Sequence, residues 1–333
     1  MGVAGVAFRD GARRVNRAPM ILAGVWVMTA LVSLPLAFVV RGMIVHHLGS
    51  SLAADSAASG VNYEWMQEFA DQATGIGVTF KPTIIGFAAV LDNLSAFLDD
   101  TPRPVAIAAA GSAYIALWIF LAGGILDRYA RDRDTGSSGF FSACGTFFFR
   151  FLRLGLVQLL AYGFLFGALH PWLFDRVFPR MIRDVTVERT AFFARVALYL
   201  VFGGLVAACN VVFDYAKVRA VVEDRRSMLG AIGNAIGFIR RNWAAAVMLY
   251  ALDFCAFLLV VALYGALVGS GGTGAMMWAA FAIGQAYIAA RLWVKLLFWA
   301  SETALFQSRL AHAGYVARPE PAWPDSPAAD AIS

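Results

Sequence analysis

Charged side chains are scarce in this sequence. Aspartate, glutamate, lysine and arginine make up 15% of the 333 residues, hydrophobic residues make up 60%, and the mean hydropathy is +0.67. Soluble globular domains typically contain about 25% charged and about 45–50% apolar residues. The composition therefore excludes an ordinary soluble domain and favours a protein that lies in a lipid bilayer.

Cysteine is rare, and the familiar catalytic motifs are missing. The three cysteines form no CxxC pair, so we expect neither a disulfide framework nor a thiolate zinc site. The sequence contains no Walker loop, HExxH, GxSxG or strand-bounded GxGxxG, and no histidine has companions at metal-ligand spacing. We therefore predict a non-enzymatic protein with no catalytic residue, no metal site and no cofactor. Lone acidic or basic residues inside a membrane can act without a readable motif, so an intramembrane enzyme stays as an alternative.

Long apolar runs are present instead. About 20 helical residues are needed to cross a hydrocarbon core of about 30 Å, and these runs lack the alternation of barrel strands. We predict an all-α polytopic bundle of six transmembrane helices occupying residues 1–310. The runs cover residues 20–40, 105–126, 154–174, 191–213, 244–268 and 276–297.

Basic residues cluster at the ends of these runs. The N-terminus, the 127–153 and 214–242 connections and the tail hold most of the lysine and arginine, whereas the 46–104 loop is acidic. The positive-inside rule then places both termini of a multi-pass protein in the cytoplasm. This distribution explains the net charge of +5 without a nucleic-acid partner. The Arg-rich connection 175–190 departs from the rule.

Two connections resemble each other. After Ser227, a candidate N-cap, apolar residues recur at helical spacing to residue 242, and the same design appears near 137–153. Both stretches predict amphipathic helices in the cytoplasmic interface. Identities at one constant offset continue into the following spans, for example Tyr162 with Tyr250 and Phe166 with Phe254. They predict an internal repeat, with the N-terminus around Arg13 and Arg14 as a third, degenerate copy.

The elbow "DYAKVRAVVEDRRS", with the opening "FRDGARRVNRAPMILAGVW" and the closing "GQAYIAARLWVKLLFWASETALF", resembles a group of bacterial six-span membrane proteins. That group is loosely similar to the membrane domain associated with glycerophosphodiester phosphodiesterases. The resemblance covers residues 8–310 and implies a six-span fold in a bacterial inner membrane. It implies no catalytic residue, and the phosphodiesterase domain itself has no counterpart in this chain.

Two segments lie outside the spans. The outer loop 46–104 contains a helix candidate at "NYEWMQEFADQ" and a second one that begins near Pro82. The second helix is either a lid over an outward-facing site or a structured cap on the bundle. The Pro/Ala-rich tail 311–333 is predicted to be disordered.

An intramembrane charge pair is the first candidate site. Asp253 lies near the middle of the fifth span, and Arg291 and Lys295 lie one turn apart in the sixth. Carboxylates inside a membrane are costly and need a partner, so we predict that these cations pair with Asp253. The pair would either serve a substrate transporter or lock two helices together. Glu302, seven residues after Lys295, is expected to be solvated.

A row of arginines at the outer face is the second candidate site. Arg176, Arg180 and Arg183 recur at helical spacing, with Arg195 in the next span. Guanidinium groups bind phosphate and carboxylate, which lipid headgroups carry, although long side chains also snorkel to the interface. We therefore expect membrane lipids as partners and a role in handling or sensing anionic envelope lipid. GxxxG pairs such as Gly163 and Gly167 leave two further alternatives open: a homo-oligomer, or an accessory or scaffold subunit of a larger membrane complex.

Overall fold

The protein is an all-helical bundle. The computed structural model describes residues 2–49, 51–59, 62–81, 86–102, 105–133, 136–268 and 275–310, and this part of the chain contains no strand. The predicted tail 311–333 lies outside the described residues. The α-helices are α1 (Val3–Asn16), α2 (Pro19–Leu48), α3 (Ala54–Ser59), α4 (Tyr63–Gln72), α5 (Gly86–Leu98), α6 (Val105–Arg131), α7 (Gly136–Phe164), α8 (Phe178–Ile182), α9 (Glu188–Val222), α10 (Met228–Arg241), α11 (Trp243–Leu267) and α12 (Ala275–Leu310).

Six helical segments in the described chain are long and apolar enough to cross a membrane, which confirms the predicted fold class. They are Pro19–Leu48, Ile107–Arg131, Gly136–Ile182, Glu188–Val222, Trp243–Leu267 and Met276–Leu310. The protein is therefore a multi-pass integral membrane protein. Five of the six segments run past the ends of the predicted apolar runs, and Trp243–Leu267 matches its run to within one residue. The fourth continues nine residues beyond the predicted end at 213, because its last turns are buried in protein.

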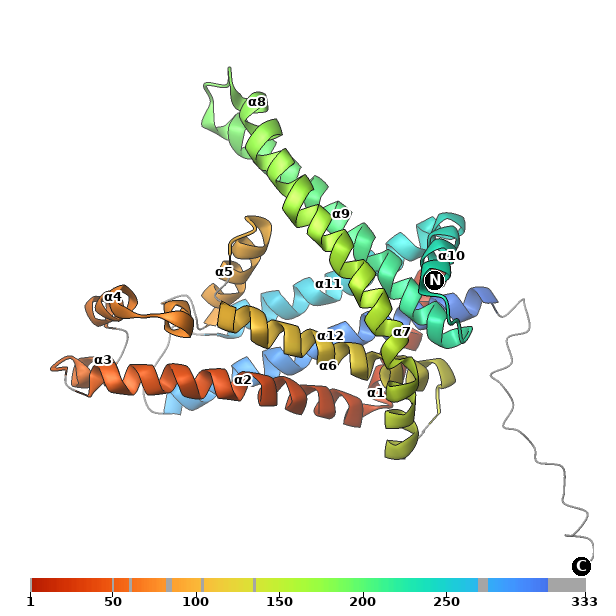
Figure 1. Ribbon diagram of the computed structural model, residues 1–333, viewed down its shortest axis with the longest axis horizontal. Helices are drawn as coiled ribbons and strands as arrows, with labels where there is room; N and C mark the ends of the chain where they lie inside the picture. Colours follow the sequence, from red (N-terminus) through yellow and green to blue (C-terminus); the bar gives the residue numbers. More distant parts are fainter. Residues whose placement is uncertain are drawn as a thin grey trace, which may run out of the picture.

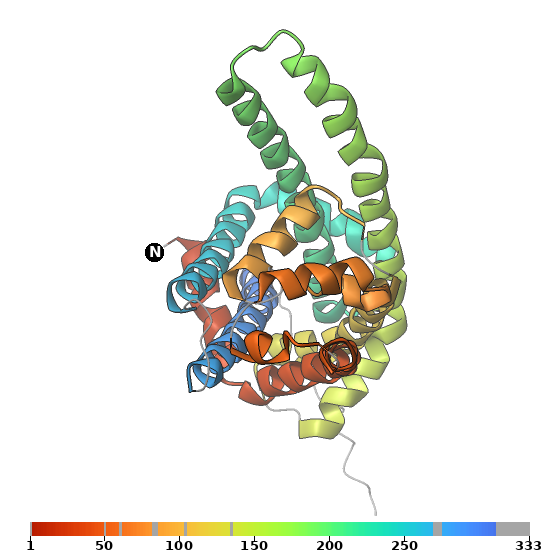
Figure 2. The same ribbon diagram turned by 90° about the vertical axis from the view of Figure 1, so that its left-hand side faces the viewer.

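The spans form two parts that diverge from a common base. Helices α7 and α9 run side by side as a long hairpin that projects away from α2, α6, α11 and α12 (Figures 1 and 2). Helix α12 is central, since it packs against α1, α2, α6, α9 and α11. We name the end of the bundle that carries α1 and α10 the core end, and the end that carries α3, α4 and α5 the loop end (Figure 1).

The main hydrophobic core lies at the core end, where α6, α9 and α12 all contact one another. Each of these three helices packs closely against a shorter helical segment: α12 against α1, α6 against the first half of α7, and α9 against α10. The core is filled by large, fully buried side chains such as Tyr129, Tyr215 and Phe306. The core end is therefore built from three similar helix pairs.

The three shorter segments bury the same pattern of positions, as a threefold repeat predicts. Ala7 of α1, Ala143 of α7 and Ala231 of α10 are all buried, and at the same offsets Arg17, Arg153 and Arg241 correspond. The corresponding buried or half-buried positions are Ala4, Gly11, Arg14 and Val15 in α1; Phe140, Phe147, Arg150 and Phe151 in α7; and Met228, Ala235, Phe238 and Ile239 in α10. The N-terminal helix thus occupies the place of the predicted third copy.

The apolar stripes of these segments face protein. The stripe of α7 packs on α6, and that of α10 packs in the core around Tyr215, while Leu229 and Phe149 on the other faces are exposed. Residues 136–164 form one continuous helix, so the segment predicted near 137–153 is the first half of α7 and not a separate helix. In the second case, α10 begins after Ser227, whose hydroxyl caps the Gly230 N–H at 3.3 Å as predicted.

Glycines allow two of the helix pairs to approach closely. A Cβ built on Gly11 would lie 2.6 Å from the Ser301 backbone of α12, and one built on Gly124 would lie 2.8 Å from the Phe140 carbonyl oxygen. At Gly163 and Gly167, in contrast, no neighbouring atom of the described chain lies within 4 Å. The GxxxG pair at 163 and 167 therefore does not mediate packing within the protein.

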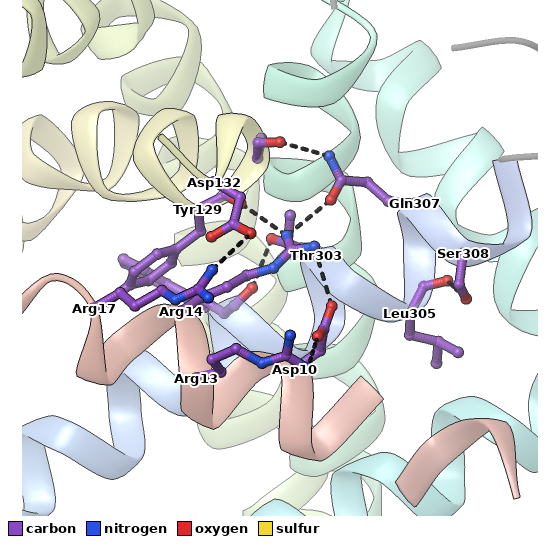
Figure 3. Close-up of polar contacts among 12 residues, drawn as sticks. Asp10, Arg13, Arg14, Arg17, Tyr129, Asp132, Thr303, Leu305, Gln307 and Ser308 are labelled. Carbon is purple, nitrogen blue, oxygen red and sulfur yellow. Dashed lines mark hydrogen bonds and ion pairs between the residues drawn. The ribbon is translucent and has the colours of Figure 1, made fainter. Parts of the chain in front are cut away.

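Each shorter segment also reaches the end of the next long helix. Arg14 donates to the Tyr129 carbonyl oxygen at 2.7 Å and to Gln307 Oε1 at 2.8 Å (Figure 3). At the corresponding position of α7, Arg150 donates to Asp224 Oδ1 at 2.6 Å, and at that of α10 the Phe238 ring lies 4.9 Å from the Phe306 ring. These contacts tie the three pairs into a ring.

The loop end is covered by short helices. Helix α4 matches the predicted helix, and Asn62 caps it by accepting the Trp65 N–H at 3.0 Å. Helix α5 contacts both parts of the bundle: Gly86 and Phe87 lie against Val268 and Gly265 after and within α11, and Phe97 packs on Phe166 of the hairpin. The start predicted near Pro82 lies outside the described residues. Helix α5 therefore bridges α11 and the hairpin.

Candidate functional site

Asp253 is the most deeply buried acidic group among the described residues, and its observed partner differs from the predicted one. Its side chain is 0% exposed, and the Ser301 hydroxyl lies 2.7 Å from its Oδ2. No ion pair joins Asp253 to Arg291 or Lys295 in the described structure, so the predicted pair is wrong. Ser301 lies six positions beyond Lys295, or about 9 Å along the helix. The two spans therefore pack in a different register from the one assumed.

Glu302 follows Ser301 and is also buried. It is 2% exposed, which contradicts the expectation of a solvated side chain, because α9 and the ring of helices at the core end cover this part of α12. One carboxylate oxygen of each acid, Asp253 Oδ1 and Glu302 Oε2, has no hydrogen-bond partner in the described structure. The Tyr215 hydroxyl of α9 is buried without a partner as well. Unsatisfied buried polar groups call for a specific explanation.

Lys295 faces aromatic rings instead of a carboxylate. Its Nζ lies 3.4 Å from the centroid of the Trp118 ring of α6 and 5.9 Å from that of Tyr114. Trp118 in turn meets Trp299 of α12 edge to face at 5.5 Å. A cation over an aromatic face is attracted to the ring quadrupole, so these rings partly replace the missing anion. The side chains of Lys295 and Arg291 both remain exposed.

A second lysine lies at the same pair of tryptophans. Lys217 of α9 pairs with Asp214 at 2.9 Å and lies 5.6 Å from the Trp299 ring centroid, and Trp299 Nε1 donates to Asp214 at 3.2 Å. Helices α6, α9 and α12 thus bring Lys217 and Lys295 together within the spans, with a single carboxylate in contact. This cluster can attract an anion at membrane depth.

The arginines of the outer row lie at the tip of the hairpin. Between α7 and α8 the chain forms two π-helical turns, Leu165–Leu169 and Trp172–Val177, so the region predicted as the connection 175–190 is helical through Ile182. Arg176, Arg180 and Arg183 are all exposed, and none of them forms an ion pair with another described residue. Because π-helical turns change the helical phase, the spacing of Arg176 relative to the other two is not that of a regular α-helix.

Arg195 differs from the other three arginines because it has an acidic partner. It extends toward Asp99 at the end of α5 at 3.4 Å and donates to the Tyr199 hydroxyl at 3.0 Å, and Tyr199 also donates to Asp99. His170 lies 2.7 Å from the Leu98 carbonyl oxygen. The hydrogen bond from Tyr199, followed by Ser95 and Arg195, holds the pKa of Asp99 below its usual value. These contacts fasten α5 to the hairpin.

Ser301, Asp214, Lys217 and the two tryptophans were not identified from the sequence. Ser301 and the tryptophans carry no charge, and each is an ordinary residue of a membrane helix. Asp214 and Lys217 lay in a stretch that the charge pattern assigned to a solvated elbow. The sequence feature that pointed to this region was the seven-residue spacing of Lys295 and Glu302, which puts both residues on one face of α12.

Comparisons with protein families, with curated proteins and with solved structures found no match for this chain.

Proposed function

We propose that this membrane protein handles or senses anionic lipid, and that the hairpin tip is where it contacts the headgroups. The observation that carries the proposal is the set of three exposed arginines, Arg176, Arg180 and Arg183, which have no acidic partner in the described structure. Arginine recognises phosphate and carboxylate oxygens by paired hydrogen bonds, and anionic headgroups supply those oxygens.

The surroundings of the tip suit a membrane interface. Trp172, Met181, Phe192 and Phe193 beside the arginines are between 47% and 63% exposed, which leaves apolar surface next to the cations. Aromatic and basic residues together are characteristic of helix ends at the level of the headgroups. The helical segment Gly136–Ile182 is 47 residues long, about 70 Å at about 1.5 Å per residue, so it exceeds a hydrocarbon core of about 30 Å.

The positive-inside pattern supports a topology in which the core end faces the cytoplasm of a bacterial inner membrane and the tip faces outward. We propose a non-enzymatic role, with lipids as partners and without nucleic acid. Inside the spans, Lys217 and Asp214 pair with each other, a contact that does not require chemistry.

Native mass spectrometry of the protein released from nanodiscs that contain anionic lipid tests this role. The wild type is compared with a variant in which Arg176, Arg180 and Arg183 are all changed to Gln. A matched control changes Arg226, Arg240 and Arg241, three exposed arginines at the core end, to Gln. We expect retained anionic lipid in the wild type and the control, and its loss in the tip variant. Equal lipid retention in all three proteins would contradict the proposal.

A substrate transporter is a second candidate, and the cluster of Lys217 and Lys295 on Trp118 and Trp299 favours it. Uncompensated charge inside a membrane is costly and marks substrate or ion pathways. In this alternative, reconstituted Asp253→Asn protein folds normally but does not transport. A stoichiometric protein partner that is retained without selective lipid would instead point to an accessory subunit of a larger complex.

A further inference from the structure

The hydrogen bonds around Ser301 determine how many protons the Asp253 site holds. The Ser301 Oγ lies 2.7 Å from Asp253 Oδ2 and 3.0 Å from the carbonyl oxygen of Phe298, in the preceding turn of α12. A serine hydroxyl has a single hydrogen to donate, together with two lone pairs that accept. It therefore cannot donate to both oxygens at the same time.

Both contacts are satisfied if Asp253 carries the proton. Protonated Oδ2 donates to Ser301 Oγ, and the Ser301 hydroxyl then donates to the Phe298 carbonyl, as serines in membrane helices commonly do. If Asp253 is ionised, Ser301 must donate its only hydrogen to the carboxylate instead of the Phe298 carbonyl. The other carboxylate oxygen, Oδ1, then stays buried without a donor. Burying an ionised carboxylate without a partner is far more costly than burying the neutral acid.

The environment of Asp253 supplies no cation to stabilise an ionised form. In the described chain no lysine or arginine nitrogen lies within 4 Å of Asp253 or Glu302. From α12, Glu302 brings a second acid. From α9, Asp214 and Lys217 pair with each other, and Tyr215 presents an unpartnered hydroxyl. Tyr250 lies one turn before Asp253 on α11, and α1 contributes Gly11, which has no side chain, against Ser301.

From this geometry we infer that Asp253, Ser301 and Glu302 form a buried proton-binding site in which Asp253 is a neutral carboxylic acid at neutral pH. Glu302, which is also buried and has no cation in contact, is the second acid of the site. Helix α1 covers the site at Gly11, which lies directly against Ser301. The ligand of this site is a proton, and the site is independent of lipid binding at the hairpin tip.

Infrared difference spectroscopy of the purified protein at pH 7 tests the inference, because a protonated carboxyl and an ionised carboxylate absorb in separate regions. The spectrum of an Asp253→Asn variant is subtracted from that of the wild type. We expect the difference to contain the C=O band of one protonated carboxyl per molecule. As a control, Asp214→Asn should remove the bands of one ionised carboxylate, since Asp214 pairs with Lys217 at 2.9 Å.

A second variant keeps the test decisive if Asp253→Asn does not fold. Ser301→Ala retains Asp253 and removes its partner, so the C=O band of the protonated acid should shift to higher frequency without being lost. Loss of ionised carboxylate bands in Asp253→Asn, or no shift of a protonated band in Ser301→Ala, would overturn the inference. Neither outcome depends on whether the tip arginines bind lipid, so this site and the proposed function can fail separately.

Discussion

The close contact between α1 and α12 predicts how alanine substitutions at two glycines of α1 change the stability of the protein. Gly11 and Gly5 both lie within α1. A Cβ on Gly11 would lie 2.6 Å from the Cα and the backbone nitrogen of Ser301, whereas a Cβ on Gly5 would meet nothing within 4 Å. Alanine at the two positions should therefore have opposite effects on stability.

The magnitude follows from two contributions. Replacing a glycine in the interior of a helix by alanine stabilises the helix by roughly 0.5–1 kcal/mol, and a gain of the same sign applies at Gly5 in the first turn. Carbon atoms in contact are about 3.5–4.0 Å apart, so at Gly11 helix α1 must move away from α12 by about 1 Å. Overpacking of this kind costs about 1–3 kcal/mol. Gly5→Ala should thus be slightly more stable than the wild type, and Gly11→Ala less stable than Gly5→Ala by about 1–3 kcal/mol.

The assay is denaturant unfolding in detergent micelles, followed by tryptophan fluorescence, with both variants measured beside the wild type. Hydrogen exchange provides a local readout, since amides of α1 should exchange faster in Gly11→Ala only. If Gly11→Ala is as stable as Gly5→Ala, then α1 does not pack on Ser301 as described. In that case the cover over the Asp253 site is absent as well.

Three further predictions concern other contacts. Arg14→Ala should cost about 1–3 kcal/mol in the same unfolding assay, because it leaves the Tyr129 carbonyl and Gln307 without their donor, whereas Arg13→Ala, which breaks only an exposed pair with Asp10, should change stability by less than about 1 kcal/mol. Gly124→Ala should destabilise the pair of α6 and α7 by about 1–3 kcal/mol, while Gly145→Ala, which meets nothing within 4 Å, should not. The pKa of Asp99 is lowered in the folded protein, so its stabilisation of the α5 bridge is present above the unfolded value and is lost as the pH falls through the lowered pKa. The protection of α5 amides from hydrogen exchange, taken relative to the intrinsic exchange rate at each pH, should therefore fall below about pH 4, and Asp99→Asn should remove that pH dependence.

Apolarity and length were sufficient to predict the six spans, because each run of about 20 apolar residues has to be helical in a membrane. They were not sufficient to predict where the helices end. Asp214 and Lys217 marked an elbow in the charge pattern, yet they pair with each other inside α9, and the helix continues to Val222 in the core. Charged residues end a span only where their side chains reach water or headgroups. The side chains of Asp214 and Lys217 instead lie against other helices of the protein.

The partner of Asp253 was not readable for a related reason. Helix α11 is apolar on all sides, so its sequence contains no stripe that fixes which turn of α12 it faces. Charge complementarity favoured Lys295, whereas in the packed structure Asp253 contacts Ser301, on the turn of α12 that also packs against Gly11 of α1. Register between two uniformly apolar helices depends on close packing of small residues, and single-sequence patterns do not specify it.

The threefold arrangement separates the scaffold from the candidate site. Asp253 of α11 corresponds to Thr29 of α2 and to Leu165 in the hairpin. Thr29 bonds to its own helix at the Val25 carbonyl, and Leu165 fills a hydrophobic cluster, so the scaffold is satisfied by a hydroxyl or an apolar side chain at this position. The helix pairs also differ in which helix supplies the glycine at the close approach. In the pair of α6 and α7, Gly123 and Gly124 lie on the long helix α6. In the pair of α12 and α1, Gly11 lies on the shorter helix α1. On α12 the residue at this close approach is Ser301, which packs directly against Gly11 of α1. Packing thus accounts for two of the three corresponding positions but not for an acid at the third, and this difference is the reason to assign Asp253 a role beyond holding the helices together.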